Sequence, residues 1–449
     1  MEQQHVLSIE VSPRDARVYE EGWQSWSPSG SYPLLEAPAR AASPLNYRGG
    51  YGGTRPMPEP DEFSGEGLLA LDPGTGEKIV VIGADSAADS VPRITARHTG
   101  GRVTVLADGA VQVSLQPAEA GLPAALAGFG NAFAVRAAVP PLRRAPTLWC
   151  SWYHYFTGVT QADMAENIAA IAELDLPVEV IQLDDGYQSE LGDWLSLSER
   201  FDSLAEMVAR IADSGRRAGI WIAPFLAGAR SRLVAEHPDW LIRDADGPVL
   251  ATHNWNQDTF GLDITHPGVQ AYLAEVFGHF VDLGFDFFKA DFLFAGALDG
   301  HRQAGLAPVA AYRHGLDLIR QAIGDAYLLG CGAPILPSVG KVDAMRVSAD
   351  TAPHFEPEGG DLSKPGGRAA ILTSRARAWQ HGRFWVNDPD CLIVRPEVEH
   401  REALAAYIAE VGGLRASSDR IADLDEWGLE QTRTLLGNVP DPTPLAGAA

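Results

Sequence analysis

The chain lacks the features that would place a protein in a membrane or outside the cell. No apolar run approaches the ~20 residues needed to cross a bilayer, and residues 1–15 are acidic, without the apolar segment of a signal peptide. Three cysteines (Cys150, Cys331 and Cys391) are scattered along 449 residues. They form no metal-ligand spacing and predict reduced thiols. We therefore expect a cytoplasmic protein.

Positive charge is also scarce. The formal net charge is −24, which disfavours nucleic acid or an anionic membrane as a partner. A neutral ligand such as a sugar is compatible with this charge. The sequence contains no glycine-rich phosphate loop and no Ser-His-Asp order. We expect no cofactor, no metal and a small-molecule partner, and we leave a homo-oligomer open.

Residues 1–140 differ from the rest of the chain. Their short apolar segments, such as 78–83 and 102–107, are separated by Gly, Pro, Asp and Ser. Residues 111–115 alternate between apolar and polar side chains with period two. This pattern predicts an N-terminal antiparallel β-sandwich.

Two loops within this part are rich in glycine and aromatic residues, 21–31 and 46–54. The first carries Trp23 and Trp26. Such tryptophans either pack a turn or reach a ligand site, and the sequence leaves both readings open.

After a proline-rich linker, strand-like and helix-like segments alternate over residues 141–437, and 438–449 form a short tail. The predicted strands are 147–153, 178–183, 218–224, 285–292, 326–331, 343–348, 384–388 and 413–416. The predicted helices begin at Thr160, with Asp163 completing a capping box, and cover 203–216, 268–283, 308–323, 368–379, 396–411 and 425–436. Eight such units predict a (β/α)8 TIM barrel. No clear helix separates strands five and six.

In such a barrel, polar residues just past the carboxyl end of each strand are the catalytic candidates. These positions hold carboxylates and aromatic residues, with single Lys and Arg residues: Trp152, Asp184, Asp185, Tyr187, Trp194, Trp221, Lys289, Asp291, Cys331, Arg346, Asp350, Asp388 and Asp390. Sugars stack their C–H faces on Trp and pair their hydroxyls with carboxylates and Lys. The list therefore predicts a carbohydrate site.

Hydrolysis of a glycosidic bond needs two carboxyl groups. One attacks and must stay ionised, and Lys289 beside Asp291 would lower the pKa of that carboxyl. The other must carry a proton for the leaving oxygen, and Asp350, in the loop after strand six, is our candidate.

Several of these residues also have plainer interpretations. Lys289 and Asp291 could form a structural ion pair, or Lys289 a Schiff base as in barrel aldolases. Asp388 and Asp390 could instead be carboxylates that stabilise a helix start or a turn. Asp184 and Asp185 are adjacent, so only one faces inward unless the turn bends both.

Six motifs occur in order along the chain: WCSWYHY (149–155), IQLDDGYQ (181–188), GDW (192–194), GIWIAP (219–224), FFKADF (287–292) and MRVSAD (345–350). Together they resemble glycoside hydrolase family 36, the melibiase-type α-galactosidases, which is related to family 27. The resemblance covers the barrel and, through GWQSWS (22–27), part of the N-terminal region. It implies an exo-acting α-galactosidase that retains configuration, with its two carboxyls ~5–5.5 Å apart.

The resemblance also implies roles for individual residues. Asp291 matches the nucleophile and Asp350 the acid that later acts as base. We expect the other candidates to bind or surround the sugar: Asp184, Asp185, Trp152, Tyr187, Trp194, Trp221, Lys289, Cys331 and Arg346.

Three departures from the family pattern bear on substrate. Tyr187 stands where Trp is usual, and the strand-five motif continues Cys331-Gly332-Ala333-Pro334 rather than Cys-Ser-Gly-Gly. That loop helps to choose between galactose and N-acetylgalactosamine. We also expect this to be a compact member that lacks the C-terminal β-domain of many relatives. An α-N-acetylgalactosaminidase, a galactosyltransferase of the raffinose-synthase kind and a non-catalytic sugar-binding protein remain as alternatives.

Overall fold

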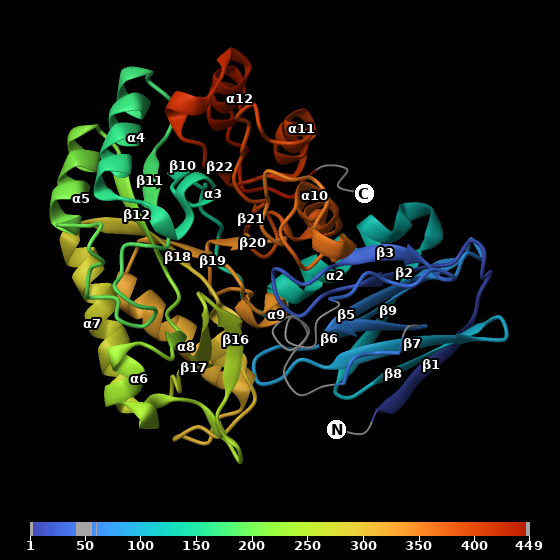
Figure 1. Cartoon of the computed structure of the whole chain (residues 1–449). Coiled ribbons are helices and arrows are strands. Elements are labelled where there is room, and N and C mark those ends of the chain that lie inside the picture. The colour runs from blue at the N-terminus through green and yellow to red at the C-terminus, as the bar shows by residue number, and fades with distance from the viewer. Residues whose placement is uncertain (1–2, 42–55, 60, 446–449) are drawn as a thin grey trace.

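A computed structural model describes residues 3–41, 56–59 and 61–445, so the predicted loop 46–54 lies outside the described residues. Figure 1 shows two parts that lie side by side, a barrel and a pair of antiparallel sheets. The predicted fold class, a TIM barrel preceded by a β-sandwich, is confirmed.

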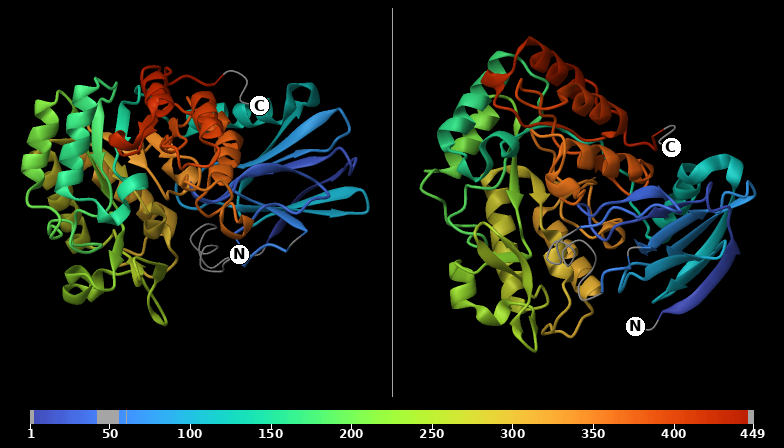
Figure 2. Two further views of the ribbon diagram at one scale, coloured as in Figure 1. Left: turned by 45° about the horizontal axis from the view of Figure 1, so that its top comes forward. Right: turned by 45° about the vertical axis from the view of Figure 1, so that its right-hand side comes forward.

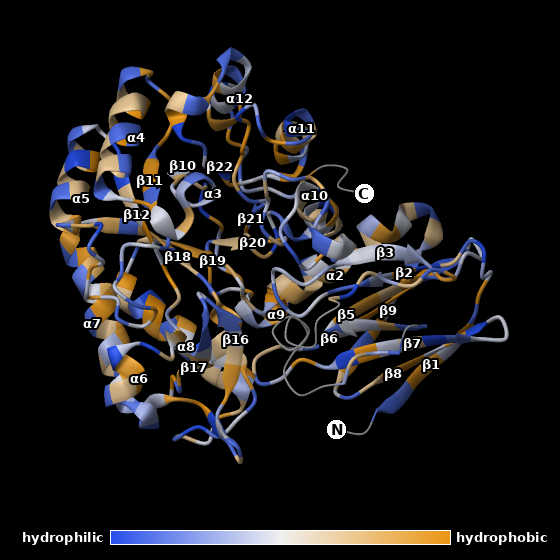
Figure 3. Cartoon of the chain, viewed as in Figure 1, coloured by the Kyte–Doolittle hydropathy of each residue, from blue (hydrophilic) through white to orange (hydrophobic). Residues whose placement is uncertain are grey.

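The sandwich consists of a five-stranded and a four-stranded antiparallel sheet. In sheet order, the first contains β3 (Gly30–Pro33), β2 (Arg17–Glu20), β5 (Leu68–Asp72), β6 (Lys78–Ala84) and β9 (Val111–Pro117). The second contains β1 (Gln4–Glu10), β8 (Arg102–Ala107), β7 (Arg93–Thr99) and β4 (Glu62–Glu66). Hydrophobic residues run along the central strands of the first sheet, such as β6 (Figure 3).

Strand β6 is apolar on both faces because both faces are covered. Val80 and Ile82 belong to the core between the two sheets, whereas Ile79 and Val81 point the other way and join the barrel core. Successive strand residues face opposite sides of a sheet, so a strand that is buried on both sides reads as a continuous apolar run.

The layer that covers β6 on the barrel side is helix α2 (Gly121–Arg136), an element that the predicted β-rich region to residue 140 did not include. Two of its glycines, Gly128 and Gly130, weaken the helical signal in the sequence. Gly130 packs tightly, because a Cβ there would lie 3.0 Å from the ring of Trp379. Helix α2 thus joins the sandwich to the barrel, and Figure 2 shows the two parts in contact there from two directions.

Eight parallel strands form the barrel in chain order. They are β10 (Thr147–Cys150), β11 (Val180–Leu183), β12 (Arg217–Ile222), β18 (Phe285–Ala290), β19 (Tyr327–Gly330), β20 (Ala344–Arg346), β21 (Val386–Asp388) and β22 (Arg415–Ser417). The last strand pairs with β10, and the backbone N–H groups of Gly413 and Leu414 donate to the carbonyl of Asn387 across the remaining seam.

Helices cover the outside of this ring. They are α4 (Gln161–Glu173), α5 (Leu204–Asp213), α7 (Pro267–Leu283), α8 (Pro308–Ile323), α10 (Gly367–Ala376), α11 (Arg401–Val411) and α12 (Glu426–Leu436). The predicted capping box is present, since Thr160 and Asp163 each accept the other's backbone N–H. Between β19 and β20 lies only the four-residue α9 (Ile335–Ser338), as expected from the missing helix signal.

Two segments depart from the predicted pattern. The first strand ends at Cys150 and turns at once into the short helix α3 (Trp152–Tyr155). After β12, the chain makes an unpredicted insertion before α7. It contains β13 (Leu226–Gly228), α6 (Arg232–Glu236), β14 (Arg243–Asp244), β15 (Gly247–Pro248) and the hairpin of β16 (Leu250–Asn254) and β17 (Gln257–Gly261). This hairpin borders the site described next.

Candidate active site

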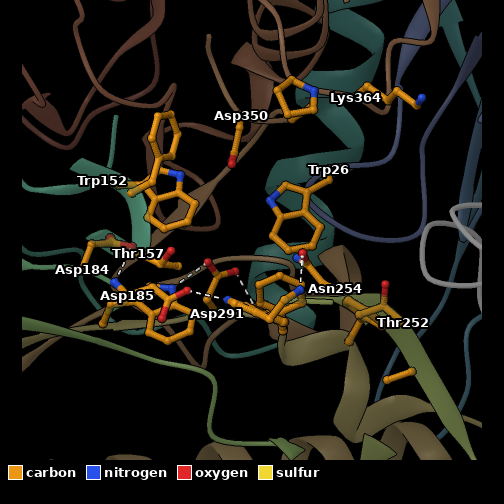
Figure 4. Close-up of a pocket in the computed structure, with 18 of the residues that line it drawn as sticks. Trp26, Trp152, Thr157, Asp184, Asp185, Thr252, Asn254, Asp291, Asp350 and Lys364 are labelled. Atoms are coloured by element: carbon orange, nitrogen blue, oxygen red, sulfur yellow. Dashed lines mark hydrogen bonds between the residues drawn. The ribbon is translucent and has the colours of Figure 1, made fainter. Parts of the chain in front are cut away.

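A cavity of about 660 Å³ opens at the carboxyl ends of the barrel strands. Its wall combines residues of three regions: strand ends and following loops, the N-terminal loop with Trp26, and the inserted β16–β17 hairpin. Figure 4 shows Asp184, Asp185 and Asp291 gathered at its base, with Asp350 directed toward them from the opposite wall.

Asp291 follows β18 and is held by two donors. The indole N–H of Trp221 donates to Oδ2 (2.9 Å), and the backbone N–H of Phe292 donates to Oδ1 (2.8 Å). Burial raises the pKa of Asp291, while Lys289 and the donors oppose this rise. Lys289 lowers the pKa of Asp291, as expected, but burial has the larger effect and the net direction is upward. Desolvation of a fully buried carboxylate outweighs the attraction of the ammonium group.

Lys289 directs its ammonium group at Asp184 rather than at Asp291. Its Nζ lies 2.9 Å from Oδ2 of Asp184, and both side chains are buried. The same oxygen accepts from the amide of Gln182 (2.7 Å) and from the thiol of Cys150 (3.3 Å). Asp184 is therefore a fixed acceptor at the base of the cavity, paired with a cation that also borders it.

Asp185 lines the cavity together with its neighbour. The turn that bends both carboxylates inward passes through Gly186, whose φ of 125° is accessible to glycine. Oδ1 of Asp185 accepts from the amide of Gln188 (2.6 Å), and Oδ2 accepts from the indole N–H of Trp255 (2.7 Å). Burial raises the pKa of Asp185 to about 6, and the two hydrogen bonds oppose this rise.

Arg346, at the end of β20, connects three carboxylates. Its Nη1 lies 2.9 Å from Oδ1 of Asp350, its Nε 3.3 Å from Asp388 and its Nη2 2.6 Å from Asp390. The side chain of Asp350 is 31% exposed, against 4% for Asp388 and 0% for Asp390. Of these three, only Asp350 borders the cavity. Asp388 and Asp390 thus fix the guanidinium that holds Asp350.

The remaining predicted residues divide into those at the wall and those behind it. Trp152 and Trp221 line the cavity. Tyr187 is fully buried and donates its hydroxyl to the carbonyl of Trp221 (3.1 Å). Trp194 packs against the ring of Trp221, with centroids 5.7 Å apart. Cys331 and Arg346 do not line the cavity either. Like Tyr187 and Trp194, they lie behind residues that do.

The N-terminal loop reaches the cavity through Trp26 but not through Trp23, which is buried in the core. The Trp26 ring meets Phe292 edge-on at 4.8 Å. The loop is attached to the strand-five loop, because Ser25 donates its backbone N–H to Ala333 (3.0 Å). The question that the sequence left open is thereby answered.

The sequence analysis did not identify the residues of the β16–β17 hairpin that line the cavity. Among them, Trp255 contacts the predicted site residue Asp185 directly. Thr252, Asn254, Trp255 and Asn256 line the cavity. They belong to an insertion in the barrel rather than to a strand end, so the rule used to select candidates did not apply to them. The usable signal was a tryptophan next to an asparagine between two polar strand-like segments.

Among the residues that the structure describes, no group of His, Cys, Asp or Glu side chains could hold a metal ion. Within the same residues, no helix is long and apolar enough for a membrane span.

Comparisons with known proteins find similarity to glycoside hydrolases. A family model for the TIM-barrel domain of glycosyl hydrolases family 31 matches residues 137–303. The bifunctional alpha-galactosidase/sucrose kinase AgaSK of Mediterraneibacter gnavus is 36% identical over 109 residues, which are 22% of this chain and 11% of that protein. The chain therefore spans a small part of the curated relatives it matches.

Solved structures align over nearly the whole chain. TtGalA, an alpha-galactosidase from Thermus thermophilus solved with p-nitrophenyl alpha-D-galactopyranoside, is 28% identical with a TM-score of 0.81, covering 97% of this chain and 89% of that one. The family 36 alpha-galactosidase AgaA of Geobacillus stearothermophilus is 15% identical with a TM-score of 0.65, covering 96% and 62%. The resemblance to the family 36 α-galactosidases is confirmed.

Proposed function

We propose that this protein is a retaining exo-α-galactosidase, with Asp291 as nucleophile and Asp350 as acid and base. The observation that carries the proposal is that these two carboxyls border one cavity from the ends of strands four and six, each held by its own donor. TtGalA, the neighbour with 28% identity, is an alpha-galactosidase solved with a galactoside.

In the first step, the Asp291 carboxylate attacks the anomeric carbon, and the glycosidic bond breaks as Asp350 donates its proton to the leaving oxygen. In the second step, Asp350 takes a proton from water, whose oxygen attacks the same carbon and releases Asp291. Two displacements return the original configuration. The indole of Trp221 and the backbone N–H of Phe292, which donate to Asp291, keep the nucleophile oriented.

Asp184, Asp185 and Lys289 supply the groups that would bind sugar hydroxyls at the base. They are buried and already hydrogen-bonded, so their orientation does not have to be established on binding, which reduces the entropy lost. Trp152 and Trp221 offer aromatic surface for the apolar face of the sugar.

The strand-five loop is our reason to favour galactose over N-acetylgalactosamine. Residues 331–334 lie behind the cavity wall, where the N-terminal segment covers them through the Ser25–Ala333 and Gln24–Pro334 contacts. The three cysteines are buried free thiols, which agrees with a reducing compartment, and we place the enzyme in the cytoplasm.

The test is release of nitrophenol from 4-nitrophenyl α-galactoside and from its N-acetyl-α-galactosaminide counterpart. We expect the wild type to hydrolyse the galactoside and Asp291→Ala to be inactive, with added azide giving β-galactosyl azide. Asp286→Asn is the matched control, because Asp286 lies at the opposite end of the same strand, paired with Arg217 at 2.6 Å.

Three results would change the proposal. Turnover of the N-acetyl sugar alone would change the proposed substrate from an α-galactoside to an N-acetyl-α-galactosaminide and leave the proposed mechanism unchanged. Full activity of Asp291→Ala would show that Asp291 is not the nucleophile. An inactive wild type would direct attention to galactosyl transfer or to sugar binding without catalysis.

A further inference from the structure

The inserted hairpin ends in an unusual two-residue turn. Asn254 pairs with Gln257, which leaves Trp255 and Asn256 as the loop, with φ angles of 52° and 54°. Positive φ at both central positions is the type I′ pattern, which favours Asn-Gly or Gly-Gly. A bulky tryptophan in the left-handed region is disfavoured by about 1–2 kcal/mol. This strain is found where the surroundings hold the residue in place, often at a functional site.

The contacts of the Trp255 side chain are with the candidate active site. Its indole N–H donates to Oδ2 of Asp185 at 2.7 Å, and its ring lies 5.0 Å from that of Phe292, the residue after the proposed nucleophile. A smaller residue would satisfy the turn but could not reach Asp185.

The turn end of the hairpin is also attached to the loop that follows Asp185. The amide of Gln257 donates to Glu190 (2.9 Å), and its oxygen accepts the backbone N–H of Arg230 (2.9 Å). Arg230 also pairs with Glu190 (2.9 Å) and donates to the carbonyl of Trp255 (3.3 Å). The position of the indole relative to Asp185 is therefore determined by several contacts.

We propose that Trp255 is a positioning residue that orients Asp185 for the binding of a galactoside hydroxyl. The inference rests on the proposed function. Gln188 occupies one oxygen of Asp185 and Trp255 the other. A carboxylate has about four acceptor sites, so each oxygen keeps one for the substrate, in a direction that the two donors set.

The indole N–H of Trp255 affects the ionisation of Asp185 because of the charged groups that surround this carboxylate. The carboxylates of Asp184 and Asp291 face it and disfavour its ionisation, and the nearby cation, Lys289, pairs with Asp184. On the hairpin, His253 is exposed and pairs with Asp258. The Trp255 hydrogen bond opposes burial and like charge, so its loss raises the pKa of Asp185 further.

The kinetic experiment compares Trp255→Phe with Trp240→Phe. Trp240 lies in the same insertion but away from the cavity, stacked on His237. For 4-nitrophenyl α-galactoside we expect Trp255→Phe to raise KM about tenfold, as for a lost hydrogen bond to a charged group. Its acidic limb of kcat/KM should move to higher pH, while Trp240→Phe stays within about twofold of wild type. An unchanged KM and pH profile in Trp255→Phe would overturn the proposal.

A second variant separates positioning from folding. Trp255→Gly relieves the strained turn, so we expect its Tm to be equal to or above that of the wild type while KM rises at least as much as in Trp255→Phe. A Trp255→Gly protein that binds substrate normally would contradict the inference.

A third readout does not need turnover. In protein labelled with ¹⁵N-tryptophan, the indole signal that is missing in Trp255→Phe should titrate in the wild type with a midpoint near 6. It should not titrate in that range in Asp185→Asn. Absence of this titration in the wild type overturns the proposal. A wild type that titrates but hydrolyses no galactoside would instead overturn the proposed function and leave the Trp255–Asp185 coupling established.

Discussion

The guanidinium of Arg377 in the barrel pairs with the carboxylate of Glu21 in the N-terminal part, at 2.7 Å, and both side chains are completely buried. The same guanidinium donates to the carbonyls of Ser25 (2.6 Å) and Gln24 (3.1 Å). Trp26 is the next residue in that loop. One arginine thus fixes both the contact between the two parts and the wall of the cavity.

Replacing Arg377 by Ala should lower the free energy of unfolding by about 3–5 kcal/mol, because it leaves Glu21 buried without its cation. Arg375→Ala is the control: Arg375 pairs with Glu410 on the surface, half exposed, where such a pair contributes at most about 1 kcal/mol. Urea unfolding of both variants measures the difference. We also expect a lower kcat/KM in Arg377→Ala, and equal stability of the two variants would contradict this account.

A second prediction concerns the indole donor to the proposed nucleophile. Trp221→Phe keeps the ring but removes the N–H that donates to Asp291, so kcat should fall about tenfold to a hundredfold. The pKa of Asp291 should rise further, moving the acidic limb of the rate profile to higher pH.

Trp194→Phe provides the matched control for this pair. Trp194 packs against Trp221, and its buried Nε1 has no hydrogen-bond partner. Removing that N–H should leave kcat within about twofold and should not reduce stability. A similar loss of kcat in both variants would mean that packing, rather than the hydrogen bond, determines the activity.

The third prediction follows from the raised pKa of Asp185. With a folded pKa of about 6 and an unfolded value of about 3.9, the folded state holds a proton that the unfolded state has lost between these pH values. Asp185 therefore lowers stability as pH rises through this window. Asp185→Asn should unfold with a free energy up to about 3 kcal/mol above wild type at pH 8 and equal to it below pH 4.

The same variant should lose activity, since the amide replaces the anionic acceptor for a substrate hydroxyl. We expect kcat/KM to fall about tenfold to a hundredfold. Denaturation curves at several pH values, with activity at pH 8, test both statements. A stability gain that does not depend on pH would exclude the ionisation of Asp185 as its cause.

Local patterns predicted most of the barrel because each of its units is short and repeats. The helix Pro308–Ile323 has the predicted bounds, and the Thr160–Asp163 capping box is present. Four of the eight barrel strands were predicted to end two or three residues too late, as at 147–153, where the chain turns into α3 after Cys150. Hydrophobicity continues past the last ladder hydrogen bond, so composition alone does not mark where pairing stops.

For the site, strand-end reasoning identified the residues whose position depends on the barrel topology, Asp184, Asp291 and Asp350, all of which border the cavity. It could not say that Lys289 pairs with Asp184 rather than with Asp291. Both carboxylates are within two barrel strands of the ammonium, and the choice depends on side-chain geometry.

The sequence by itself determined the eight barrel strands, the helices that cover them and the carboxylates at the strand ends, because those follow from periodicity and from neighbours along the chain. Only the tertiary structure decided which distant segments complete the cavity. Trp26 and Trp255 reach it across about 230 residues of sequence from each other, through the Glu21–Arg377 pair and the strained hairpin turn. Such contacts depend on the packing of surfaces that form only once the barrel has closed, and no local pattern encodes them.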